Sequence, residues 1–95
     1  MNCDIIICLS HLGWKYDNDK VSDVILAEKS RNIDLIIGGH THTFFSQPYE
    51  MRNADGLPVL INQVGWAGLV LGRIDFYFDK IKNENSWRSA SVWVE

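Results

Sequence analysis

The chain has 95 residues, a formal net charge of −3 and a hydrophobic content of 46%, which suits one globular domain or a part of one and argues against disorder. The acidic balance and the lack of a basic cluster argue against duplex nucleic acid and anionic membranes as partners. No apolar run approaches the roughly 18 residues that a membrane helix needs, and no signal-peptide pattern opens the chain. The compartment is left open.

Two continuous apolar runs predict parallel strands in the first half of the chain. They cover residues 5–9 and 35–37 and show no alternation, which is typical of strands that are covered on both faces. The segment between them predicts a helix, so that residues 1–43 form a βαβ unit. The fold class expected from this pattern is α/β.

The predicted helix carries signals at both ends. Asp19 is expected to cap its N-terminus, and Asp23 places negative charge in its first turn. Lys29 and Arg31 suit the negative C-terminal end, and Asn32 tolerates the left-handed conformation that stops a helix. An i, i+3, i+4 stripe for docking on the sheet is formed by Val21, Val24 and Ile25.

The second half, residues 44–95, predicts mostly antiparallel β structure. A turn at residues 53–56 precedes a short strand at residues 58–62. Residues 72–79 and 89–95 alternate between apolar and polar side chains, and a polar linker between them predicts a hairpin. The phenylalanines expected in the core are Phe44, Phe45, Phe76 and Phe78.

All three histidines follow predicted strands. His11 follows the first strand, and His40 follows the second after Gly38-Gly39. Because sites in open α/β sheets form outside the carboxyl ends of the strands, both should emerge at the same edge. In an extended chain, His40 and His42 would project the same way with Cα atoms roughly 6.5–7 Å apart. The pattern therefore predicts a site for divalent metal ions, with ordinary polar turns as the alternative.

The two cysteines, Cys3 and Cys8, are five residues apart on one predicted strand. Odd spacing in a strand places side chains on opposite faces, so we do not expect them to pair with each other. Gly65 and Gly68 are expected to shape a turn between strands.

The segments "DIIICLSHLG", "IDLIIGGHTHT" and "PVLINQVGWAGLVLGRIDFYFD" together resemble the later part of a calcineurin-like metallophosphoesterase domain, in the 5′-nucleotidase branch. The resemblance implies half of a four-layer α/β/β/α sandwich that hydrolyses phosphate esters or nucleotides with two divalent ions of the Zn, Mn, Fe, Ca or Mg class. By the family pattern, His11 and His40 bind one metal and His42 binds the other. Gln63 or Trp66 lining a pocket is a further option that the family suggests.

The family's earlier motifs, Asp-x-His, Gly-Asp-x-x-Asp and Gly-Asn-His-Glu/Asp, are absent from residues 1–95. Asp17, Asp19 and Asp23 do not replace them by motif, and we expect a solvated helix entrance there. The chain is therefore expected to be a partial metallophosphoesterase domain that holds at most one ion. It has no identifiable catalytic residue and is expected to be inactive by itself, although parents in this family are often exported enzymes.

Two alternatives stay open. In the first, the chain is a non-catalytic module whose open strand edge and uncovered apolar face favour homo-oligomerisation or pairing with a separately encoded amino-terminal half. In the second, it is a mononuclear zinc hydrolase or hydratase with His11, His40 and His42 as ligands and one bound water.

Overall fold

The chain forms two β-sheets and one helix in a computed structural model that describes residues 3–79, 81 and 84–94. The elements in chain order are β1 (Ile7–Leu9), α1 (Asp23–Lys29), β2 (Leu35–Ile37), β3 (Tyr49–Arg52), β4 (Pro58–Asn62), β5 (Val70–Asp79) and β6 (Glu84–Trp93). Within the described part of the chain, no helix is both long and apolar enough to cross a membrane.

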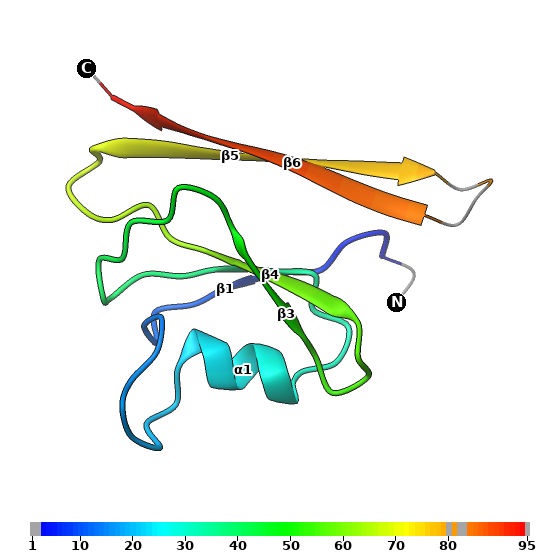
Figure 1. Cartoon of the computed structure of the whole chain (residues 1–95), viewed down its shortest axis with the longest axis horizontal. Helices are drawn as coiled ribbons and strands as arrows, with labels where there is room; N and C mark the ends of the chain where they lie inside the picture. The colour runs from blue at the N-terminus through cyan, green and yellow to red at the C-terminus, as the bar shows by residue number, and fades with distance from the viewer. Residues whose placement is uncertain (1–2, 80, 82–83, 95) are drawn as a thin grey trace.

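The first sheet has the strand order β1-β2-β4-β3, and β5 and β6 form a separate hairpin. β1, β2 and β4 are parallel to one another, and β3 is antiparallel to β4. Figure 1 shows α1 on one side of the four-stranded sheet and the hairpin on the other, which gives a layered α/β/β arrangement. The predicted α/β class, with a βαβ unit followed by antiparallel strands, is confirmed.

The core lies between α1 and the sheet. Ala27 of the helix packs against Ile36, Val59 and Ile61 of the sheet, and all four have 0% of their surface exposed. The opposite face of the sheet is covered less completely near β1. Three apolar residues there remain 43–79% exposed: Ile7, Leu9 and Ile37. The sheet is thus sealed by the helix on one side and left partly open on the other.

The helix begins later than the sequence predicted. Its N-cap is Ser22, whose Oγ accepts a hydrogen bond from the backbone N–H of Ile25 at 3.3 Å, so the assignment of the cap to Asp19 was wrong. Val21 precedes the helix and is 55% exposed, so it cannot belong to a docking stripe. The buried helix residues are instead Asp23 and Ala27, one turn apart. Asn32 has the expected left-handed conformation, with φ of 69°.

The strands of the second half were predicted in part. The strand at Pro58–Asn62 and the hairpin are confirmed, but β6 begins at Glu84, where it pairs with Asp79, so much of the expected polar linker is strand. β3 was missed because it is a short edge strand without apolar alternation. Two of the predicted core phenylalanines, Phe44 and Phe78, are 46% and 43% exposed. Both cysteines are free.

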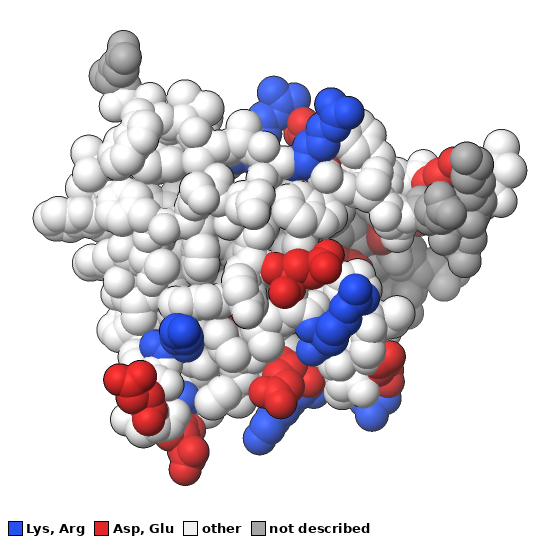
Figure 2. All heavy atoms as spheres, in the orientation of Figure 1, with Lys and Arg blue, Asp and Glu red and all other residues white. Residues whose placement is uncertain are grey.

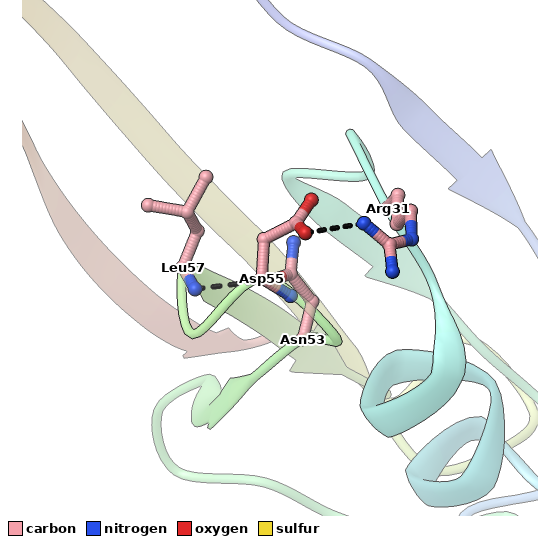
Figure 3. Close-up of polar contacts among 4 residues, drawn as sticks. All are labelled: Arg31, Asn53, Asp55 and Leu57. Carbon is pink, nitrogen blue, oxygen red and sulfur yellow. Dashed lines mark hydrogen bonds and ion pairs between the residues drawn. The ribbon is translucent and has the colours of Figure 1, made fainter.

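The turn predicted at residues 53–56 is confirmed and is closed by Asn53. Its Oδ1 accepts hydrogen bonds from the backbone N–H groups of Asp55 at 2.8 Å and Leu57 at 3.0 Å (Figure 3). Arg31 reaches across from the end of the helix and pairs with the Asp55 carboxylate at 2.5 Å. The Arg31 and Asp55 side chains are 66% and 39% exposed, whereas Asn53 is 8% exposed.

We expect Asn53→Ala to lower the free energy of unfolding by about 1–2 kcal/mol, because one side-chain oxygen serves two backbone donors of the turn. Arg31→Ala, which removes an exposed ion pair in the same region, should cost only about 0–1 kcal/mol. Urea denaturation of both variants measures the difference. An equal or larger loss for Arg31→Ala would show that the ion pair, not the Asn53 amide, closes this hairpin.

Candidate metal centre at the histidine edge

His11 and His40 meet at the carboxyl ends of β1 and β2, as the sequence predicted. His40 Nδ1 lies 3.3 Å from His11 Nε2, and the two rings meet edge to face with centroids 5.0 Å apart. Gly39 lies beside this pair, and a Cβ at that position would make an ordinary van der Waals contact with His11 Nδ1 at 3.4 Å. Figure 1 shows the loops that follow β1, β2 and β4 gathered on the left side of the view.

His42 does not join this pair. Its ring stacks on the indole of Trp66 with centroids 5.8 Å apart and an angle of 12° between the planes. His40 and His42 both have left-handed backbone conformations, with φ of 73° and 54°, so the extended geometry that we used to place them side by side was wrong. Among the described residues, no group of three or more His, Cys, Asp or Glu side chains is placed to hold a metal ion.

The spacing of the His11–His40 pair fits a shared metal ion. Two imidazole nitrogens, each about 2.0–2.1 Å from one tetrahedral zinc, lie about 3.3 Å apart. The distance between His40 Nδ1 and His11 Nε2 is 3.3 Å. The same separation also suits a weak hydrogen bond between a protonated and an unprotonated nitrogen. The pair can therefore supply two ligands of one ion, and further ligands must come from elsewhere.

Charged side chains do not crowd this edge. Figure 2 shows that the upper left of the molecule, where the loops after β2 and β4 lie in Figure 1, is largely free of Lys, Arg, Asp and Glu, whereas charges of both signs lie at the lower left, where the loop after β1 runs. Asp17 and Asp19 are exposed, as expected for a solvated helix entrance.

The two residues that the family suggested as a pocket lining differ in exposure. Trp66 is 58% exposed, whereas Gln63 is 2% exposed, so Gln63 lies beneath the histidine loop and does not line an open pocket.

The loop that carries His40 and His42 is held by the Gln63 side chain. Gln63 Oε1 accepts a hydrogen bond from the backbone N–H of Thr43 at 3.0 Å, and Nε2 donates to Thr41 Oγ1 at 3.1 Å. Thr41 Oγ1 also accepts from the backbone N–H of Trp14 at 3.0 Å. The two threonines of "GGHTHT" thus anchor the loop while the two histidines project from it, a role that the sequence pattern did not indicate.

Asp23 is buried beneath the same loop, so its assignment to a solvated helix entrance was wrong. It has 0% of its surface exposed, and its Oδ1 accepts a hydrogen bond from Ser10 Oγ at 2.5 Å. A Cβ on Gly38 would collide with Asp23 Oδ2, which explains a glycine at that position. Burial raises the pKa of Asp23, and the polar contacts with Ser10 and Gln63 lower it only in part. The second carboxyl oxygen, Oδ2, has no hydrogen-bond partner among the described residues.

The raised pKa predicts a pH-dependent loss of stability. Because the folded chain binds the Asp23 proton more tightly than the unfolded chain, stability falls as pH rises from about 4 through the folded pKa. Asp23→Asn removes this titration. We therefore expect the free energy of unfolding of the parent chain to fall relative to that of Asp23→Asn over this interval, in urea titrations at several pH values. A constant difference between the two chains would contradict the raised pKa.

Several known proteins are similar to this chain in sequence, although no family model matches it. The chain is 40% identical over 75 residues to the trifunctional nucleotide phosphoesterase protein YfkN of Bacillus subtilis, covering 79% of this chain and 5% of that protein. It is 33% identical over 107 residues to an apyrase of Tabanus yao, covering 97% and 18%. Human 5′-nucleotidase is 28% identical over 96 residues, covering 87% and 16%.

Among solved structures, the 5′-nucleotidase precursor of Thermus thermophilus matches with a TM-score of 0.66 and 26% identity, over 75% of this chain and 16% of that one. The chain thus spans between 5% and 18% of the length of these proteins. Fold and relatives together define a nucleotide phosphoesterase-like domain. The chain belongs to the calcineurin-like metallophosphoesterase superfamily, in its 5′-nucleotidase branch, and corresponds to part of that domain. Enzymes of this family generally use divalent metals.

Proposed function

We propose that this chain contributes the histidine edge of a metal-dependent nucleotide phosphoesterase and does not turn over phosphate esters by itself. In a complete two-metal centre His11 and His40 would hold one divalent ion and His42 the second, whereas the 95-residue chain by itself holds only the first. The observation that carries the proposal is the 3.3 Å separation of His11 Nε2 and His40 Nδ1. When bound, such an ion supplies Lewis-acid stabilisation of charge on a phosphoryl oxygen.

The lack of turnover follows from the ligand set. Two divalent cations close together repel each other strongly, and carboxylates that bridge them normally offset this repulsion. Only neutral imidazoles converge at this edge among the described residues, and none of the described carboxylates completes a group of three ligands. One ion bound by two imidazoles and water is therefore expected, with weak and exchangeable binding.

Calorimetric titration of the purified 95-residue chain with Zn²⁺ and Mn²⁺, beside a phosphatase assay with AMP and p-nitrophenyl phosphate, tests the proposal. We expect about one equivalent of weakly bound ion and no turnover above background. Robust metal-dependent turnover that is lost in His40→Ala would contradict the inactivity of the chain. Failure to bind either ion at millimolar concentrations would contradict the metal centre itself.

A second candidate function is supported by the open side of the sheet. β1 is an edge strand, and Ile7 and Leu9 on it are 48% and 79% exposed. An unpaired strand edge beside exposed apolar side chains favours pairing with another chain. In this case the chain is a non-catalytic module that forms homo-oligomers or binds a separately encoded amino-terminal half. Light scattering that shows a monomer at high concentration would argue strongly against the homo-oligomer.

The third candidate, a mononuclear zinc hydrolase with three histidine ligands, has less support. It requires His42 to converge with His11 and His40, but the His42 ring stacks on Trp66. One tightly bound zinc per chain in a metal analysis would favour it, because a complete set of three imidazoles binds zinc more strongly than two.

A further inference from the structure

Asp23 and Gln63 form a buried polar support beneath both histidine loops. Their exposed fractions are 0% and 2%. Asp23 Oδ1 accepts from Ser10 Oγ, one residue before His11, and Ser10 Oγ also accepts from the backbone N–H of Leu12 at 3.2 Å. Gln63 contacts the other loop on both sides of His42. Asp23 and Gln63 both lie against Gly38, since a Cβ at that position would meet Asp23 Oδ2 and Gln63 Cγ. The two loops therefore rest on the same buried pair of side chains.

The Gln63 amide has only one consistent orientation in this network. Thr41 Oγ1 accepts from two N–H donors, those of Trp14 and of the Gln63 amide, so its own hydrogen is free to be donated to Thr43 Oγ1 at 2.8 Å or to Gln63 Oε1 at 3.4 Å. Because Gln63 Oε1 accepts from the Thr43 backbone N–H, the oxygen and nitrogen ends of the amide cannot be exchanged. The network therefore specifies one conformation of the loop between residues 40 and 43.

That conformation is costly for the backbone alone. Left-handed φ values at residues other than glycine cost about 1–3 kcal/mol each, and the loop has two of them, at His40 and His42. A hydrogen bond contributes about 0.5–1.5 kcal/mol, so several bonds from one rigid support are needed to offset the strain. Gln63 is the buried side chain that supplies bonds to both threonines of the loop.

We propose that Gln63 is a positioning residue for the candidate metal centre: its amide holds His40 and His42 in their strained conformations, and Asp23 couples that loop to the His11 loop through Ser10. Where it concerns metal affinity, the inference rests on the proposed function. Where it concerns the conformation of the loop, it stands on the hydrogen bonds and dihedral angles alone.

The test replaces Gln63 with methionine, which keeps the length of the side chain and removes its hydrogen bonds. In the 95-residue chain we expect Gln63→Met to lower Zn²⁺ affinity about 10–100-fold, as loss of a supporting residue does at metal sites. The Thr43 amide should also exchange with solvent faster relative to the Ile36 amide, which reports global unfolding. The matched control is Asn62→Leu, which removes the neighbouring 8% exposed amide, whose Oδ1 has no partner among the described residues.

A second variant keeps the proposal testable if Gln63→Met does not fold. Thr41→Val removes the hydroxyl that Gln63 and Trp14 contact, at an exposed position, and it should give the same faster exchange at Thr43 and altered His42 ring signals in NMR spectra. Should the parent chain bind no zinc, the proposed function fails and these two signals alone decide the inference. It is overturned if both signals stay as in the parent chain, or if zinc affinity falls no further in Gln63→Met than in Asn62→Leu.

Discussion

Ile36→Ala is expected to lower the free energy of unfolding by about 2–5 kcal/mol, the usual cost of emptying a fully buried isoleucine site. Ile36 has 0% exposure and lies in the middle of β2, paired with Cys8 on one side and Ile61 on the other. The neighbouring strands fix the backbone around it, so the cavity cannot collapse easily. For a chain of this size, with a total stability of about 5–15 kcal/mol, such a loss removes a large share of the folded population.

The adjacent residue provides the control. Ile37 is on the same strand with its side chain on the opposite face of the sheet, and it is 43% exposed. Ile37→Ala should therefore cost about 1 kcal/mol or less, since only part of the side chain leaves water on folding. Urea denaturation of the two variants at low protein concentration gives the comparison. Equal losses would mean that the face of the sheet near β1 is covered in solution, as a homo-oligomer would require.

The elements that the sequence predicted well are those whose pattern is local. β2 and β4 are buried on one or both faces, and their apolar runs show this directly. The turn that Asn53 closes carries a compositional signal, because three of its four positions hold turn-forming residues: Asn53, Asp55 and Gly56. β3 has no such signal, because an edge strand is stabilised mainly by its partner, and its pairing with β4 follows from the position of the turn.

The candidate site was predicted in its position but not in its detail. The carboxyl ends of parallel strands had to meet, which brought His11 and His40 together. The place of His42 depends on two left-handed residues, and nothing in the order of histidine and threonine indicates them. The sequence did not indicate the burial of Asp23 either, because an aspartate in a first helical turn is normally solvated. Asp23 is buried because Ser10 and Gly38 pack over its side chain.

His40→Ala is expected to reduce the affinity of the chain for Zn²⁺ by roughly 100-fold or more, beyond the 10–100-fold cost of losing a supporting residue. A factor of 100 corresponds to about 2.7 kcal/mol of binding free energy. The physical reason is that two imidazoles, His40 Nδ1 and His11 Nε2, converge at 3.3 Å, so each variant leaves a single protein ligand. His11→Ala should therefore cause a loss of similar size, measured by calorimetric titration with Zn²⁺.

His42→Ala separates the competing ligand sets. If one ion is held by His11 and His40 alone, removal of His42, whose ring stacks on Trp66, leaves the affinity of the chain nearly unchanged. A loss as large as that of His40→Ala would mean that the loop rearranges to bring all three imidazoles onto one zinc, against the geometry seen here. Trp66→Ala distinguishes the two cases further, because freeing the His42 ring from its stacking partner should raise zinc affinity only where His42 is a ligand of that ion.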